Sequence, residues 1–129
     1  MTEITSRKNE YIRHLRQLAA ERGYRTERGE YLCDGLKLLK EAVQFGACVT
    51  SVLWKDKPQF VPGLDCTGQY VAPAELFDYA SPMKNSPGPL FTVAVPVQNM
   101  QQPIGRAIVL ENVQDPGNVG TVIRTANAF

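Results

Sequence analysis

Apolar side chains recur at helical spacing in the otherwise polar N-terminal segment of the chain. They are Tyr11, Ile12, Leu15, Leu18 and Ala19. An apolar stripe of this period indicates an amphipathic helix, which we expect over residues 7–21. Thr5 or Ser6 is the expected N-cap, because a hydroxyl oxygen can accept a hydrogen bond from the first free amides.

From residue 23 to residue 96 the pattern alternates between short apolar runs and further helical stripes. Strands are predicted over 30–33, 49–54, 69–71 and 90–95, and helices over 35–45 and 73–80. Asp34 is the expected cap of the helix over 35–45. A polar, basic loop is predicted over 23–29, and a loop containing Pro and Gly is predicted over 81–89. This alternation predicts an α/β domain with helices on both faces of a small sheet.

A second unit follows a segment rich in Gln, Asn and Pro. An apolar run over 107–110 is typical of a strand, and a helical stripe of Val119, Val122, Ile123 and Ala126 comes after it. The expected organisation is a domain over 1–96, a linker over 97–105, and a strand and helix over 106–129.

The composition is that of an ordinary globular protein, with 43% hydrophobic and 21% charged residues. No apolar run approaches the roughly 20 residues that span a membrane, and the polar N-terminus does not resemble a signal peptide. Cys33, Cys48 and Cys66 lack the paired spacing of a zinc site or a disulfide framework. We therefore expect a cytoplasmic protein with free thiols, no bound metal and no membrane partner.

The formal net charge of +1 conceals an asymmetry. Residues 1–28 contain seven basic and four acidic side chains. An Arg-rich segment of this kind indicates an anion-binding face, but a solvated helix with ordinary charge pairs has the same composition. Charge alone favours the second interpretation.

The segment over 115–124 has the composition of a tight turn that leads into a helix. Pro116 and Gly117 favour the turn, and Gly120 permits close approach of another backbone. The first amides of the helix are expected to be unpaired and to attract an anion, with Arg124 projecting toward the same point. The pattern matches neither a Walker loop nor a dinucleotide-binding motif. From the residues alone, a capped helix that exposes Arg124 is favoured over a phosphate site.

The string DPGNVGTVIRTANAF resembles the first conserved motif of the SpoU/TrmH family, the RNA 2′-O-ribose methyltransferases with the knotted SPOUT fold. The matching residues are Asn118, Gly120, Arg124, Thr125 and Ala126. Independently, ITSRKNEYIRHLRQL and EYLCDGLKLLKEAV resemble the substrate-binding domain of the same family, which is a ribosomal-protein-like three-layer α/β RNA-binding module. The resemblance covers nearly the whole chain, in the order of the family.

This resemblance implies S-adenosylmethionine as the methyl donor, a homodimeric enzyme, and RNA as the substrate, with ribosomal RNA favoured over transfer RNA. It implies catalytic roles for Asn118 and Arg124. Asn9, Arg13, Arg25 and Arg28 are the expected RNA contacts, because the predicted helix and loop place them in one region. Tyr24 and Tyr31 flank this basic loop, where stacking on an unpaired base is a further hypothesis.

The chain departs from the family in one important respect. The later motifs, which form the knot and bind S-adenosylmethionine, are not among these 129 residues. We therefore expect the chain to be inactive by itself and to bind no cofactor. A non-catalytic RNA-binding or ribosome-associated module is the alternative. Pro87-Gly88-Pro89 in place of a Pro-Gln-Gly-like turn, and Asp34 in place of a Glu, are smaller departures.

Overall fold

The computed structural model describes residues 1–66, 68–97 and 105–129. Most of the predicted linker over 97–105 therefore lies outside the described residues. The chain divides into two compact units, Met1–Val97 and Gln98–Phe129.

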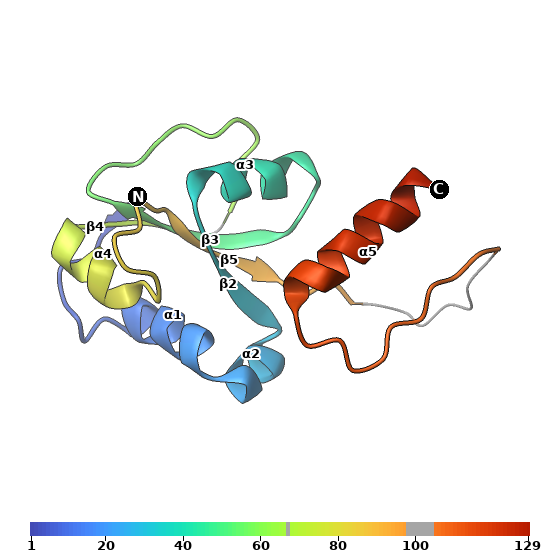
Figure 1. Cartoon of the computed structure of the whole chain (residues 1–129). Coiled ribbons are helices and arrows are strands. Elements are labelled where there is room, and N and C mark those ends of the chain that lie inside the picture. The colour runs from blue at the N-terminus through green and yellow to red at the C-terminus, as the bar shows by residue number, and fades with distance from the viewer. Residues whose placement is uncertain (67, 98–104) are drawn as a thin grey trace. The chain divides into compact units, whose positions relative to one another are not determined.

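The first unit is built on a five-stranded mixed sheet with the strand order β1-β4-β3-β5-β2 (Figure 1). Its strands are β1 (Thr2–Glu3), β2 (Glu30–Asp34), β3 (Val49–Lys55), β4 (Gly68–Ala72) and β5 (Leu90–Ala94). β1 and β3 both pair with β4 in parallel, and β5 pairs with β3 and β2 in antiparallel orientation. β1 was not predicted, because two residues are too few to show an alternating pattern.

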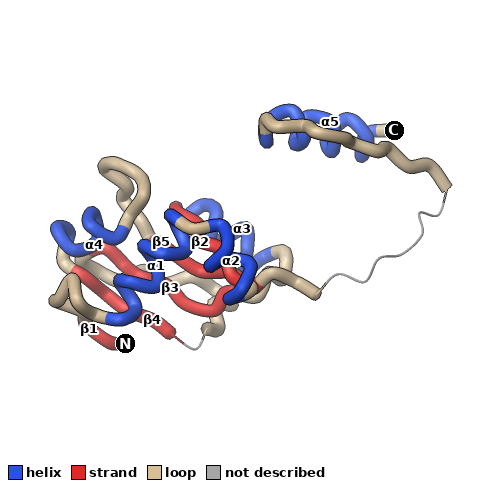
Figure 2. Tube along the Cα trace, turned by 90° about the horizontal axis from the view of Figure 1, so that it is seen from below, coloured by secondary structure: helices blue, strands red, loops and turns tan. Residues whose placement is uncertain are grey.

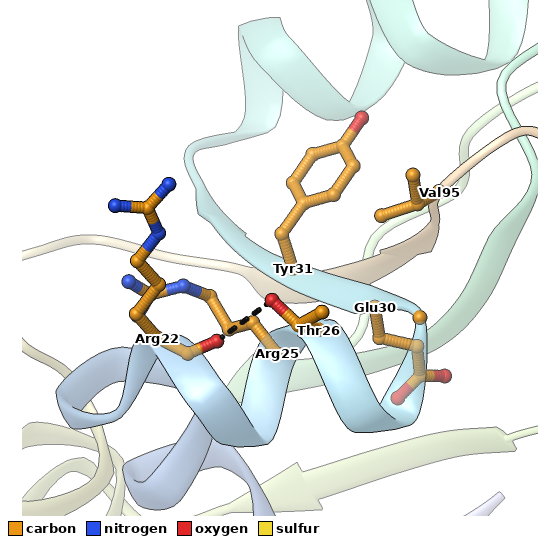
Figure 3. A pocket seen from close by; sticks show the side chains of 7 residues that line it. Arg22, Arg25, Thr26, Glu30, Tyr31 and Val95 are labelled. Atoms are coloured by element: carbon orange, nitrogen blue, oxygen red, sulfur yellow. Dashed lines mark hydrogen bonds between the residues drawn. The ribbon is translucent and has the colours of Figure 1, made fainter. Parts of the chain in front are cut away.

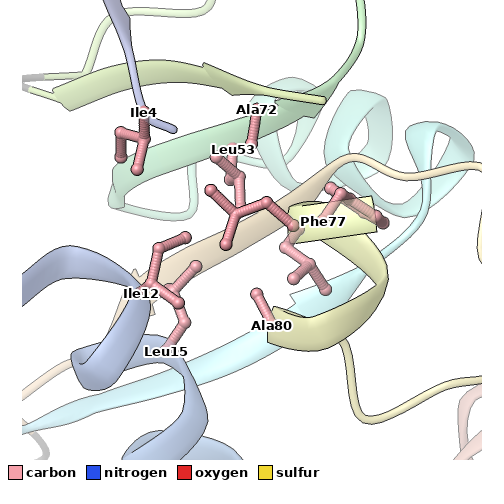
Figure 4. Packing of buried hydrophobic residues seen from close by; sticks show 9 residues of the cluster. Ile4, Ile12, Leu15, Leu53, Ala72, Phe77 and Ala80 are labelled. Atoms are coloured by element: carbon pink, nitrogen blue, oxygen red, sulfur yellow. The ribbon is translucent and has the colours of Figure 1, made fainter. Parts of the chain in front are cut away.

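Helices cover both faces of this sheet, as the sequence predicts (Figure 2). α1 (Glu10–Ala20) and α4 (Ala74–Ala80) pack on one face, and α3 (Leu36–Gln44) packs on the other. Along β3, Leu53 faces the first core while Val52 and Trp54 face the second, since successive strand residues point to opposite sides. Figure 4 shows the first core, where side chains of α1 and α4 meet those of the sheet.

The first helix begins later than predicted, and its expected caps are wrong. Asn9 caps α1, with its Oδ1 accepting a hydrogen bond from the Tyr11 amide at 2.9 Å. Ile4 is buried, and its amide donates to the Val71 carbonyl at 2.9 Å. Because the chain is held on β4 as far as Ile4, residues 5–9 are needed for the turn into the helix.

The predicted loop over 23–29 is wrong, because Arg22–Arg28 forms a short helix, α2. Gly29 ends it with a φ of 64°, a conformation that glycine adopts without strain. The Arg25 guanidinium donates to the carbonyls of Leu18 and Ala19 at 2.7 and 3.3 Å. These tertiary bonds help to hold α2, which lacks the apolar stripe that would reveal a helix in the sequence.

Asp34 does not cap α3, contrary to the prediction. Gly35 occupies the N-cap position without a side-chain bond. The Asp34 carboxylate instead accepts hydrogen bonds from the hydroxyls of Ser86 and Ser81 at 2.5 and 3.4 Å. The Gly35 amide donates to the Pro89 carbonyl at 2.9 Å. Asp34 and Gly35 therefore hold the loop over 81–89 at the end of β2.

In the second unit, the helix is present as α5 (Pro116–Ala128), but the predicted strand over 107–110 does not form. Ile108 and Val109 are 61% and 88% exposed. A strand is completed by hydrogen bonds to a neighbouring strand, and residues 107–110 have no such pairing in the described chain.

Three further expectations concern membranes, thiols and metals. None of the described helices is long and apolar enough to cross a bilayer. All three cysteines are free, which confirms the prediction. Over the described ranges, no group of three His, Cys, Asp or Glu side chains is arranged to hold a metal ion.

Candidate functional site

The N-terminus of α5 is capped from within the chain. The Asp115 carboxylate accepts a hydrogen bond from the Gly117 amide at 2.8 Å. The Asp115 carbonyl accepts from the amides of Asn118 and Val119 at 3.1 and 3.3 Å, and Pro116 has no N–H to offer. The expectation of unpaired amides here is therefore wrong, and the Asp115 carboxylate makes this turn unfavourable for an anion.

Arg124 and Asn118 lie on α5 and are both exposed. A Cβ built on Gly120 would lie 3.9 Å from Nη2 of Arg124. The guanidinium therefore extends back along the helix toward its N-terminus, as helical side chains do. Asn118 is six residues earlier, about 9 Å along the axis and about 120° around it. The two residues are thus on different faces of one helix, and only the length of Arg124 brings them closer.

The Lys and Arg side chains of residues 1–28 form no ion pair within the part of the chain that the structure describes. The described ion pairs of the molecule are His14–Glu30 and Lys55–Asp78. Within the described chain, none of the seven basic side chains of residues 1–28 pairs with a carboxylate. These side chains are Arg7, Lys8, Arg13, Arg16, Arg22, Arg25 and Arg28. The charge pairs of the interpretation that charge alone favoured are therefore not found among the described residues, whereas its solvent exposure is, since all of these side chains except Arg25 are exposed.

Several of these arginines pack on tyrosine rings instead. The guanidinium carbons of Arg7 and Arg16 lie 4.3 and 3.9 Å from the centroid of the Tyr79 ring. Arg28 lies 5.8 Å from the centroid of Tyr24. Arg13 is exposed, and its guanidinium makes no hydrogen bond or ring contact within the described residues. The Lys and Arg side chains of this segment thus form no close ion pair with a carboxylate among the described residues.

The structure brings together only part of the predicted RNA-contact set. Arg25 and Arg28 share α2, and Arg25 contacts the C-terminal end of α1. Asn9 lies at the opposite end of α1, about 15 Å along the axis from Ala19. Its side-chain oxygen is also occupied by the capping bond. Asn9 is therefore separate from the α2 arginines.

A pocket of about 390 Å³ lies between α2 and β2 (Figure 3). It is lined by Arg22, Arg25, Thr26, Gly29, Glu30, Tyr31 and Val95. The sequence analysis missed Arg22 and Val95, because their proximity depends on the unpredicted helix α2. The sequence did contain a signal for the position of Tyr31. Successive side chains of a strand point to opposite faces, so the Tyr31 ring lies on the opposite face of β2 from Glu30 and Leu32.

A network of hydrogen-bonded polar side chains extends from α2 into the sheet. The His14 side chain is only 16% exposed and contacts the Tyr24 hydroxyl at 2.7 Å and Glu30 at 2.9 Å. The other oxygen of Glu30 accepts from the Thr50 hydroxyl at 2.9 Å. Thr92 and Ser51 extend this hydrogen-bond network to the Tyr11 hydroxyl. Burial raises the pKa of Tyr11 above its usual value.

Two curated proteins are similar to this chain along 99% of its length. One is an uncharacterised tRNA/rRNA methyltransferase of Synechocystis sp., which is 32% identical. The other is the 23S rRNA (guanosine(2553)-2′-O)-methyltransferase of Bacillus subtilis, which is 28% identical. The chain spans about half the length of each, 50% and 51%. No protein-family model matches the chain.

Solved structures show the same fold at lower identity. An S-adenosylmethionine-bound rRNA methyltransferase from Sinorhizobium meliloti aligns with a TM-score of 0.73 and 24% identity, over 98% of this chain and 51% of that one. The SpoU methyltransferase AviRb from Streptomyces viridochromogenes, in complex with the same cofactor, aligns with a TM-score of 0.69 and 22% identity. That alignment covers 94% of this chain and 50% of that one.

Proposed function

The chain belongs to the SpoU/TrmH family of RNA methyltransferases, and from that premise we propose that its two units serve different steps of 2′-O-ribose methylation. Residues 1–96 recognise the RNA, and residues 106–129 contribute Asn118 and Arg124 to the catalytic centre. S-adenosylmethionine supplies the methyl group. Ribosomal RNA is the favoured substrate, since the Bacillus subtilis relative is named for its action on 23S rRNA.

The observation that carries this proposal is the unneutralised charge of residues 1–28. Seven basic side chains in this segment have no carboxylate partner in the described structure. A soluble domain gains little stability from such repulsive charge, whereas phosphate groups of RNA offer it direct compensation. Arginine suits this role because its planar guanidinium can bind two phosphate oxygens at once.

Arg124 acts on the ribose through charge rather than by removing a proton. A ribose hydroxyl is a poor nucleophile, so its attack requires both positioning and charge compensation. Arginine stays protonated at any physiological pH. We therefore assign its guanidinium to the RNA phosphate beside the reacting ribose, where it orients the hydroxyl and stabilises developing charge. Asn118 shapes the same site.

RNA affinity should fall when two exposed arginines, one on α1 and one on α2, are removed together. We expect Arg13→Ala/Arg28→Ala to weaken binding of a transcribed 23S rRNA fragment. The slope of log affinity against log salt should flatten by about 1.5–2, because two phosphate contacts are lost. Fluorescence anisotropy at several salt concentrations measures both effects. Arg25 is left unchanged because it holds the carbonyls at the end of α1.

Lys40→Ala/Lys57→Ala is the matched control, since it also removes two exposed positive charges but leaves α1 and α2 intact. This control should retain most of the affinity. Equal binding by the arginine and lysine double variants would show that α1 and α2 do not form the RNA-binding face. Absence of RNA binding by the unmodified chain would reject the proposed function of the first unit.

The 129-residue chain should not bind S-adenosylmethionine in the micromolar range. The first-turn amides of α5 are already bonded to Asp115, so this turn has little to offer the cofactor. Isothermal titration calorimetry measures the interaction directly, with S-adenosylhomocysteine as a second ligand. Micromolar binding of either compound would place the cofactor site within these residues and overturn the assignment.

A further inference from the structure

The pocket between α2 and β2 contains an aromatic ring that the fold itself does not use. Tyr31 is 39% exposed, and its ring and hydroxyl make no ring contact or hydrogen bond within the described residues. Val95, beside it, is 51% exposed. In Figure 3 the Tyr31 ring stands away from β2, and the Arg22 side chain extends along the other margin of the pocket.

The walls of this pocket are held in place from behind. Arg25 anchors α2 to the end of α1 through the carbonyls of Leu18 and Ala19. The Val95 amide donates to the Gly29 carbonyl at 2.7 Å, which joins the end of α2 to the end of β5. A preformed site loses less conformational freedom on binding than a flexible one. The residues that line the pocket are therefore held in place by the fold before any ligand binds.

The charge of the pocket favours an anionic ligand. Glu30 is its acidic residue, and both carboxylate oxygens are occupied, one by His14 and one by Thr50, each at 2.9 Å. Figure 3 shows the Glu30 side chain directed away from Tyr31. Arg22 is exposed and has no carboxylate partner in the described chain. The pocket thus combines a free ring face, an apolar edge and an uncompensated guanidinium.

We propose that this pocket binds one unpaired nucleotide of the RNA, with the base stacked on Tyr31 and a flanking phosphate bound by Arg22. The proposal rests on the proposed function and adds a preference for single-stranded RNA. Bases within a duplex have no free face for an aromatic side chain, whereas bases in loops and bulges do. The volume of about 390 Å³ lies within the usual range for small-ligand sites, about 300–1,000 Å³.

Substitution of the ring tests the proposal on two forms of one RNA. With a single-stranded oligoribonucleotide, Tyr31→Ala in the 129-residue chain should weaken binding roughly 5- to 150-fold, the usual effect of removing one stacking ring. With the same sequence as a blunt duplex, the affinity should not change. Tyr31→Phe retains the ring and should bind both forms as the unmodified chain does. Arg22→Ala should weaken single-strand binding and also reduce its salt dependence.

Phe60→Ala is the control for loss of an exposed aromatic ring elsewhere, since Phe60 is 87% exposed in the β3–β4 loop. It should leave binding unchanged. Photo-cross-linking with 5-bromouridine, followed by peptide mapping, should identify Tyr31. If Tyr31→Ala binds single-stranded RNA as tightly as the unmodified chain, the pocket is not the site, although RNA recognition by the first unit stands. If the unmodified chain binds neither form, the proposed function itself fails.

Discussion

Arg124→Ala should lower methyl transfer by about 100- to 1,000-fold in the longer enzyme that we propose contains this chain. This range is typical when a charged or hydrogen-bonding group that stabilises the transition state is removed. Arg124 is exposed on α5, and the described residues provide no carboxylate partner for it. Its loss should therefore leave the helix intact. Single-turnover transfer of radiolabelled methyl groups to saturating RNA measures the effect on the chemical step.

Arg124→Lys separates charge from geometry. Lysine retains the positive charge but lacks the planar guanidinium that binds two phosphate oxygens, so it should restore only part of the rate. Arg106→Ala removes an exposed arginine from the same unit and should leave the rate unchanged. A rate for Arg124→Ala within threefold of the unmodified enzyme would reject a role for this side chain in methyl transfer.

Phe77→Ala should reduce the stability of the first unit by about 3–5 kcal/mol, as expected for truncation of a buried phenyl ring. Phe77 is fully buried on α4 and belongs to the core formed with Ile12, Leu15 and Leu53 (Figure 4). A Cβ built on Gly88 would lie 2.8 Å from its ring, which shows how closely the loop over 81–89 is packed here. Domains of this size are stable by about 5–15 kcal/mol in total. Urea unfolding measured by circular dichroism determines the loss.

Phe60→Ala provides the comparison, because the same change is made where the ring is 87% exposed. Its effect should remain within about 0.5 kcal/mol. A similar small loss for both variants would mean that α4 does not pack on the sheet as described. Loss of RNA binding by Phe77→Ala in parallel with unfolding would also confirm that recognition requires the folded first unit.

The amino-acid sequence by itself determined those helices and strands whose buried apolar side chains recur in a regular pattern. The apolar run of Val52, Leu53 and Trp54 predicted a strand, and the structure places this strand between two cores. The stripe of Ile12, Leu15 and Leu18 specified α1, and all three side chains are buried. The resemblance to the SpoU/TrmH family was also evident from the sequence, since the motif around Arg124 is contiguous. The roles of Asn118 and Arg124 remain predictions.

Only the tertiary structure decided the features that depend on contacts between separate elements of the fold. α2 has no apolar stripe, and Arg25 bonds it to carbonyls six and seven residues earlier. Asp34 was predicted to cap a helix because a cap is recognised from neighbouring residues in the sequence. Its carboxylate instead accepts hydrogen bonds from serines on a loop about fifty residues away. The Tyr31 pocket likewise requires α2, β2 and Val95 together. The spacing of apolar residues indicates which side chains are buried. The partner of a polar group depends instead on which segments the folded chain brings within hydrogen-bonding distance.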